Sequence, residues 1–381
     1  MIYFDNSSTS YPKAPGVSQA VAEVLERGSF NINRGGYASA YEMSGLALDT
    51  REKVAELFDA STGREVVFTG GITQSLNIAL KGLLCPRDHV VTTQMEHNGV
   101  IRPLAQLQDL GVHVDVARCG SDGKLDLADM ESKITDQTKL VVMTHASNVC
   151  GTILPIREVG ALCRKRGVLL LVDSAQTAGV IPISMSRDNI DILAFTAHKG
   201  LLSAQGLGGL VLSQQIAEKM TPLIAGGTGS HSHVADMPNE LPDRLEAGTL
   251  NLPGIVALSV ALDYINEIGI DTIYNHEINL LSRLSEGLNG ISGVDIVGPE
   301  SITDKCAVAA LDFVEMDNAE VAAGLDEEYG IMTRCGLHCA PIAHKALGTF
   351  PRGVVRCSFG HKNTEAEVDK LLLALRNIIR T

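Results

Sequence analysis

The sequence predicts an α/β protein, in which a large domain with a mostly parallel sheet is joined to a smaller α+β domain. Between about residues 50 and 215, short runs without a polar face alternate with amphipathic stretches of helical length. Strands that are apolar on both faces belong to sheets covered by helices on both sides, and such sheets are mostly parallel. After about residue 250 the sequence changes to long helices with a few strands between them. We place the large domain at residues 15–250 and the small domain at residues 1–14 and 251–381.

The elements of the large domain follow from apolar spacing and from the positions of glycines. Apolar residues three and four apart predict helices, whereas short runs rich in Val, Leu and Ile predict strands. Helices are predicted at residues 49–58, 72–83, 100–110 and 156–166, and strands at residues 65–69, 89–93, 139–144, 168–172, 192–195 and 209–212.

The predicted small domain contains long helical patterns and fewer strand-like runs. Its closing helix follows the cap residues Asn363 and Thr364. Residues 226–233 are rich in Gly, His and Ser, which predicts a mobile loop. Long amphipathic helices are predicted at residues 255–268, 273–288 and 364–379, and strands at residues 294–297, 307–313 and 354–358.

Composition excludes several classes of function. The 381 residues carry a net charge of −14, and their Lys and Arg residues form no cluster. A nucleic-acid-binding protein needs a basic face, so we expect no nucleic-acid partner. No apolar run approaches the roughly 18 residues of a membrane span, and the N-terminus lacks the pattern of a signal peptide. We therefore expect a cytoplasmic protein that does not bind a membrane.

The eight cysteines are scattered along the chain and include no C-x-x-C pair. Disulfide frameworks are typical of short secreted proteins. We therefore expect most of these thiols to be reduced and buried.

Charged residues follow two neighbouring predicted strands at their carboxyl ends. Asp173 follows the strand at residues 168–172, and Lys199 follows the strand at residues 192–195. Taken alone, Asp173 fits a helix cap and Lys199 fits a solvated strand end. Together they fit a pyridine-ring cofactor, which needs an amine for a Schiff base and a carboxylate to keep the ring nitrogen protonated. Both side chains can face one crevice at the carboxyl edge of the sheet.

A glycine-rich turn adds a pattern that suits phosphate. Gly70-Gly-Ile-Thr73 lies between a predicted strand and a predicted helix, where backbone N–H groups and the Thr73 hydroxyl can bind a phosphate. An ordinary glycine turn explains the same residues, so the motif is weak by itself.

The order of short motifs along residues 3–356 resembles that of fold-type I pyridoxal-phosphate enzymes of the class V aminotransferase group. Within this group the sequence resembles the cysteine desulfurases and selenocysteine lyases. The resemblance implies a mostly parallel sheet of the seven-stranded type, pyridoxal 5'-phosphate as the cofactor, and a homodimer. The matching motifs are Tyr3-Phe-Asp-Asn6, Asn33-Arg-Gly35, Phe68-Thr-Gly-Gly-Ile-Thr73, Glu96-His97, His145-Ala-Ser-Asn148, Val172-Asp-Ser-Ala-Gln176, Thr196-Ala-His-Lys199, Arg244-Leu-Glu-Ala-Gly-Thr249, His338-Cys-Ala340 and Arg356.

The resemblance implies that five residues hold the cofactor ring. Lys199 would carry the cofactor as a Schiff base, and Asp173 would pair with the pyridinium nitrogen. His97 would stack on the ring. Asn148 and Gln176 would contact its phenolic oxygen.

The phosphate has its own set of implied ligands. Thr249, or the loop at residues 226–230, would reach the phosphate of a neighbouring subunit. Within the subunit the implied ligands are the Ile72 amide, Thr73, Thr196 and His198.

Arg356 is the implied ligand of the substrate carboxylate, which it would bind as a bidentate fork. Asn33 and Arg334 would line the same substrate site. Arg356 lies in an apolar strand, so either a ligand carboxylate or a protein acid must balance its charge. His97 also has an alternative, a surface ion pair with the neighbouring Glu96.

Cys339 decides which reaction is expected. It lies in Thr333-Arg-Cys-Gly-Leu-His-Cys-Ala-Pro341, which the Gly and Pro residues predict to be a loop. A cysteine is commonly a small buried hydrophobe, but His338 and Arg334 favour an accessible thiolate here.

The segment also resembles the Arg-x-Gly-x-His-Cys-Ala motif of the second desulfurase group. This resemblance implies that Lys199 moves the Cα proton of the substrate and that the Cys339 thiolate attacks the substrate sulfur. The products would be alanine and a Cys339 persulfide, which passes sulfur to an acceptor protein.

The segment departs from the family pattern at Cys335 and Leu337. A thiol four residues before Cys339 could resolve the persulfide, form a disulfide or join a metal site. His338 and His344 are nearby in sequence, but no spacing matches a firm zinc motif, so we expect no metal.

Other activities remain open on this scaffold. The expected substrates are L-cysteine and L-selenocysteine, and the alternatives are a selenocysteine lyase, a cysteine or cystine C–S lyase, and an aminotransferase. These enzymes do not need a mobile thiol at position 339. A non-catalytic sulfur-relay protein is a further alternative, which the intact set of Lys199, Asp173, His97 and Arg356 disfavours.

Overall fold

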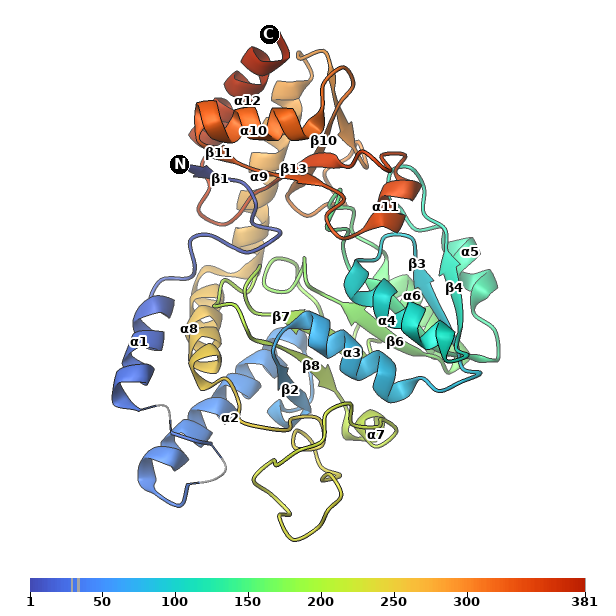
Figure 1. Cartoon of the computed structure of the whole chain (residues 1–381), viewed down its shortest axis with the longest axis vertical. Helices are drawn as coiled ribbons and strands as arrows, with labels where there is room; N and C mark the ends of the chain where they lie inside the picture. The colour runs from blue at the N-terminus through green and yellow to red at the C-terminus, as the bar shows by residue number, and fades with distance from the viewer. Residues whose placement is uncertain (29, 33–34, 381) are drawn as a thin grey trace.

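A seven-stranded sheet forms the centre of the larger part of the molecule in the computed structural model, which describes residues 1–28, 30–32 and 35–380 (Figure 1). The strand order is β2-β8-β7-β6-β5-β3-β4. Only β8 runs antiparallel to its neighbours, so the predicted α/β fold with a largely parallel sheet is confirmed. The strands are β2 (Val66–Thr69), β3 (His89–Thr93), β4 (His113–Ala117), β5 (Thr138–Thr144), β6 (Leu169–Asp173), β7 (Ile192–Thr196) and β8 (Gly208–Leu212).

Two apolar cores cover the two faces of this sheet. Alternate strand residues point to opposite faces, so Val66 belongs to one core and Val67 to the other. One core is formed with α3, α4 and α7, and the other with α2, α5, α6 and α8. The helices are α1 (Val17–Arg27), α2 (Ala38–Phe58), α3 (Ile72–Leu83), α4 (Asn98–Asp109), α5 (Leu127–Lys133), α6 (Ile156–Arg166), α7 (Gln214–Ala217) and α8 (Leu252–Ile268).

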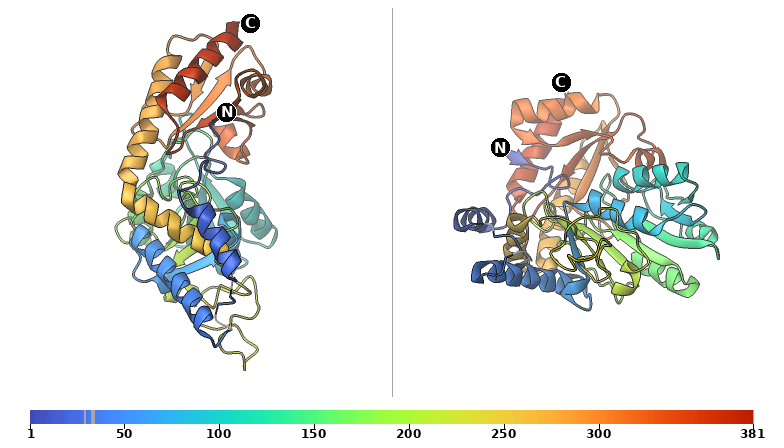
Figure 2. Two further views of the ribbon diagram at one scale, coloured as in Figure 1. Left: turned by 90° about the vertical axis from the view of Figure 1, so that its left-hand side faces the viewer. Right: turned by 60° about the horizontal axis from the view of Figure 1, so that its bottom comes forward.

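The smaller part is a four-stranded antiparallel sheet in the order β12-β13-β10-β9, with helices α9, α10 and α12 on one face. The N-terminal strand β1 (Ile2–Tyr3) pairs with β11 (Ile331–Met332), so the first residues lie beside the C-terminal part of the chain (Figure 2). The other elements are α9 (Ile270–Leu288), β9 (Val294–Val297), β10 (Val308–Phe313), α10 (Asn318–Tyr329), β12 (Arg334–Gly336), α11 (Pro341–Ala346), β13 (Val354–Ser358) and α12 (Glu365–Arg380).

The predicted domain boundaries at residues 14 and 250 stay a prediction. Helix α8 packs against α1 and α2, and α9 continues from it into the smaller part (Figure 2). Within the described residues no single helix is long and apolar enough to cross a membrane. Helices α8 and α9 together reach that length and composition, but they meet at 79°.

Most predicted elements are confirmed to within a few residues. The helix predicted at residues 49–58 begins earlier, at Ala38, and one predicted loop is in part a strand. Residues 334–336, predicted as loop, form the strand β12, which pairs with β13. The short edge strand β4 was missed, because it exposes most of its side chains and carries no apolar run. Residues 226–233 contain no helix or strand, and their mobility stays a prediction.

Candidate active site

The residues predicted to hold a cofactor gather at the carboxyl edge of the seven-stranded sheet. Asp173 is the last residue of β6, and Lys199 follows the end of the parallel neighbour β7. His97 follows β3 and Asn148 follows β5, the next strands along the sheet. The parallel strands therefore bring four predicted residues to one edge, as their order in the sequence implied.

Lys199 is partly buried, and its amine lies near one carboxylate, Asp173, and two arginines, Arg334 and Arg356. Burial lowers the pKa of Lys199 to about 8, with the Asp173 carboxylate opposing this shift and Arg356 and Arg334 adding to it. The segment that carries it is fixed by Lys13, whose Nζ donates to the His198 carbonyl at 2.8 Å. At this pKa a minor fraction of the amine is neutral at pH 7, and that fraction becomes the majority above about pH 8.

Asp173 is buried, with 3% of its surface exposed. Burial raises the pKa of its carboxyl, an effect that the nearby Lys199 partly opposes. Its Oδ1 accepts from the Ala175 N–H at 2.9 Å, but this closes a turn and no helix begins there, so the helix-cap alternative was wrong. Within the described residues its other oxygen accepts no hydrogen bond, which leaves that oxygen for a cationic partner.

The glycine-rich turn lies in a pocket that suits a phosphate. Helix α3 starts at Ile72, and the first N–H groups of a helix have no acceptor within it. The adjacent Gly71 has a φ of 137°, which a side chain would strain. The His198 Nδ1 is buried without a hydrogen-bond partner. The pocket is lined by Gly70, Gly71, Ile72, Thr73, Gln74, Asn77, Thr196, His198, Gln205, Gly206 and Leu223.

His97 caps helix α4 and is not part of an ion pair. Its Nδ1 accepts from the Gly99 N–H at 2.9 Å, which places the proton of the neutral ring on Nε2. Burial, and then the charge of Lys199, lowers its pKa to about 4. The surface ion pair with Glu96 was wrong, because Glu96 is fully buried and accepts from the Thr93 hydroxyl and the Thr144 N–H instead.

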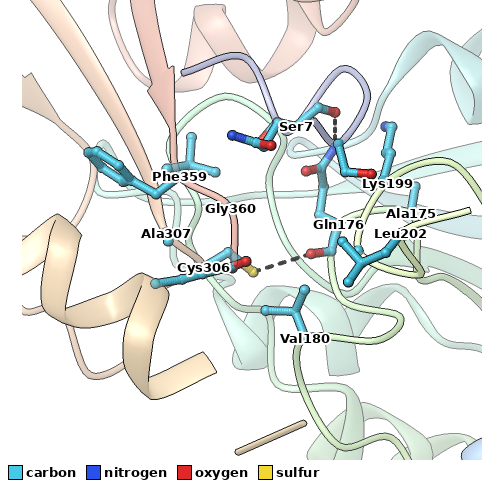
Figure 3. A pocket seen from close by; sticks show the side chains of 15 residues that line it. Ser7, Ala175, Gln176, Val180, Lys199, Leu202, Cys306, Ala307, Phe359 and Gly360 are labelled. Atoms are coloured by element: carbon cyan, nitrogen blue, oxygen red, sulfur yellow. Dashed lines mark hydrogen bonds between the residues drawn. The ribbon is translucent and has the colours of Figure 1, made fainter. Parts of the chain in front are cut away.

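Gln176 is held between the N-terminal segment and the smaller part of the molecule. Its Nε2 donates to the Ser7 carbonyl at 3.2 Å, and its own carbonyl accepts from the Cys306 thiol at 3.7 Å (Figure 3). These residues line a small cavity together with Lys199. The N-terminal segment thus forms one wall beside the candidate site.

Arg356 and Arg334 lie directly opposite each other on the paired strands β13 and β12. Two like charges in this position repel, so the pair requires anionic or polar partners. Arg356 is 1% exposed and donates to the Asn148 carbonyl, to Asp5 Oδ1 at 2.6 Å and to Ser8 Oγ. Its Nε is buried without a partner. A protein acid therefore partly balances the charge of Arg356, and a donor remains for a ligand.

Cys339 is exposed and lies beside Arg334, with Sγ 4.0 Å from Nη2. It forms a tight turn with His338, closed by the Ala340 N–H donating to the Leu337 carbonyl at 2.8 Å. Both central residues have positive φ, 48° for His338 and 57° for Cys339. Such residues are strained by about 1–3 kcal/mol each and persist only where their surroundings hold them.

Cys335 does not face Cys339. Side chains alternate along β12, and Cys335 packs against the core under the smaller sheet while Arg334 faces the larger part. Burial raises the pKa of its thiol. This orientation gives no support to a role for Cys335 in resolving a persulfide.

The remaining sequence predictions have mixed outcomes. All eight cysteines are free, and four of them are buried. Thr249 is exposed and outside the phosphate pocket of its own chain, while Asn33 lies outside the described residues. Among the residues described, no three His, Cys, Asp or Glu side chains gather as a metal site. Asp5 and Ser8 were missed, because nothing in the sequence links them to an arginine about 350 residues away.

Comparisons with known proteins agree with this geometry. Residues 2–371 match the model of the family Aminotransferase class-V. A probable cysteine desulfurase of Methanothermobacter thermautotrophicus is 33% identical, over 99% of this chain and 94% of the relative. A cysteine desulfurase of Haloferax volcanii is 31% identical, over 98% and 88%. The apo structure of a cysteine desulfurase from Thermococcus onnurineus NA1 has a TM-score of 0.92 and 32% identity, over 100% and 94%.

Proposed function

The chain belongs to the class V aminotransferase family, and from this we propose that it is a cysteine desulfurase that uses pyridoxal 5'-phosphate. Its proposed substrates are L-cysteine or L-selenocysteine, and its proposed product is alanine. The observation that carries the proposal is the exposed Cys339 thiol beside Arg334, in the same chain as the partly buried Lys199 and the buried Asp173 at the sheet edge.

The residues of the sheet edge fit the proposed cofactor. The Ile72 and Thr73 amides, the Thr196 hydroxyl and His198 would hold its phosphate, and Asp173 its ring nitrogen. The neutral His97 would lie on the ring face, and Asn148 and Gln176 near its oxygen. When bound, pyridoxal phosphate provides an electron sink that stabilises negative charge at the substrate Cα.

Lys199 would carry the cofactor and move the proton at the substrate Cα. Its lowered pKa suits this role, because a general base works best when its pKa is close to the working pH. Arg356 would orient the substrate through the carboxylate, using the unpartnered Nε and replacing part of its contact with Asp5. Arg334 adds positive charge on the same side.

Cys339 would take the sulfur. A bond forms between the Cys339 sulfur and the substrate sulfur, the substrate C–S bond breaks, and Cβ gains a proton as alanine is produced. The Arg334 guanidinium lies beside this sulfur, with Nη2 4.0 Å from Sγ. The persulfide on an exposed residue would then be open to a sulfur acceptor.

We also propose a homodimer. Leu223, which lines the phosphate pocket, and its neighbour Ile224 are both 44% exposed, although both are large and apolar. Thr249 is likewise exposed. A second copy would cover these side chains and bring Thr249, or residues 226–230, to the phosphate of its partner.

Replacing Cys339 with alanine tests the proposed function. In C339A, alanine formation from L-cysteine should fall at least about a hundredfold, because the attacking sulfur is gone. Alanine and sulfide are measured together, and C335A is the matched control with normal turnover. Unchanged release from cysteine in C339A would contradict the proposal. Retained turnover of L-selenocysteine alone would assign the chain to the lyases instead.

The pH dependence of proton transfer tests the role of Lys199. A pKa lowered from 10.5 to about 8 populates the neutral amine at a lower pH, so Cα exchange should rise up to about pH 8 and then level off. The measurement is deuterium uptake at the Cα of L-alanine across this range. A rate that still climbs toward pH 10 would mean that an ordinary exposed lysine, or another base, moves the proton.

A further inference from the structure

The turn that carries Cys339 adopts a backbone conformation that its residues do not favour. A two-residue turn with positive φ at both central positions normally contains Asn and Gly. Here the two positions are occupied by His338 and Cys339. Contacts outside the turn must therefore hold it.

Both carbonyls of the turn accept hydrogen bonds from the larger part of the molecule. The Asn148 side-chain amide donates to the His338 carbonyl at 2.8 Å, and the Asn98 N–H donates to the Cys339 carbonyl at 2.7 Å. Asn98 is the first residue of helix α4, where N–H groups lack acceptors within the helix. These bonds hold the turn from the side of the larger part, and neither of them contacts β13.

The His338 ring contacts β13 and so holds the turn from the side of the smaller part. It is 3% exposed, and its Nε2 lies 3.3 Å from the Val354 carbonyl on β13. Its ring centroid lies 5.9 Å from that of His344, which is fixed by Thr349 at 2.7 Å. Burial keeps the ring neutral, so its one N–H is available to donate to Val354. The side chain is therefore seated between β13 and α11.

We propose that His338 is a positioning residue for sulfur transfer. Its seated ring holds the strained turn so that the Cys339 thiol stays beside Arg334, where it would meet the substrate sulfur. Without the ring the backbone can relax to negative φ, which moves the thiol. Displacement of a reacting group by about 1 Å can cost on the order of a hundredfold in rate. The inference rests on the proposed function, but it concerns a residue that touches neither cofactor nor substrate.

The test compares three rates in the holoenzyme with His338→Ala. Deuterium exchange at the Cα of L-alanine requires Lys199 but not the thiol, so its rate in H338A should stay near that of the wild-type protein. Alkylation of Cys339 by iodoacetamide should also persist, because the thiol remains exposed. Single-turnover formation of the Cys339 persulfide should fall by about tenfold to a hundredfold. A merely structural role would not separate these rates.

C335A is the control, since Cys335 lies on the other face of β12, and it should leave all three rates unchanged. Persulfide formation that is unchanged in H338A would overturn the proposal, and so would a parallel loss of exchange and transfer. His338→Asn provides a second variant. Asn tolerates positive φ but is too short to reach Val354, so persulfide formation should fall less than in H338A, with exchange and alkylation again unchanged. If the unmodified protein forms no persulfide, the proposed function fails rather than this inference alone.

Discussion

Replacing Lys199 with alanine should abolish desulfuration and Cα exchange together, by at least about a thousandfold. The amine is the attachment point proposed for the cofactor and the base proposed for the Cα proton, so both functions disappear with one side chain. The purified K199A protein should also lack the absorbance band near about 420 nm that a lysine Schiff base gives, even after cofactor is added. Spectra and exchange rates provide the measurement.

Lys305 offers a matched control for this variant. It is also buried, at 2% exposure, and burial lowers the pKa of its amine too. It precedes β10, pairs with Thr152 in a β-bridge, and does not line the cavity that Lys199 lines. K305M should therefore keep the absorbance band and the exchange rate. Activity retained in K199A would show that another residue carries the cofactor.

Removing Arg51 should cause a large loss of stability, about 3–5 kcal/mol in the free energy of unfolding. Its guanidinium forms a bidentate ion pair with Glu246 at 2.6 Å, with both side chains buried. It also lies 4.4 Å from the centre of the Phe68 ring. In R51M the Glu246 carboxyl would stay buried without its cation. Denaturant unfolding of R51M measures the effect.

The double variant R51M/E246M is the control for the Arg51 prediction. Buried ion pairs can often be replaced by apolar side chains at little cost, so the double variant should recover much of the lost stability. Complete recovery is not expected, because the Phe68 N–H also donates to Glu246 and would lose its acceptor. A double variant as unstable as R51M would show that packing rather than charge causes the loss.

The sequence located the parts of the site that follow buried strands. Asp173 directly follows a run without polar residues, and Lys199 comes shortly after the next such run, at residues 192–195. The helix beginning at Ile72 was predicted for a related reason, since two glycines separate it from β2. In these cases a few consecutive residues are enough for the prediction. The residues then lie close together because neighbouring parallel strands end at the same edge of the sheet.

The parts that the sequence did not reveal depend on contacts between distant residues. Asp5 binds Arg356 across 351 residues of chain, and Glu246 binds Arg51 across 195. No local pattern marks either pair. The strand β12 has only three residues, too few to show an alternation, and yet it decides that Cys335 and Arg334 face opposite sides. Its pairing partner β13 provides that information only in the folded chain.

The most direct test of Cys339 as the sulfur carrier is the mass of the intact protein after one turnover with L-cysteine. A desulfurase that uses Cys339 should gain the mass of one sulfur atom per alanine formed, and the added sulfur should lie on the peptide that contains Cys339. Alanine formed without added sulfur on the protein, or sulfur found on Cys335 instead, would contradict this.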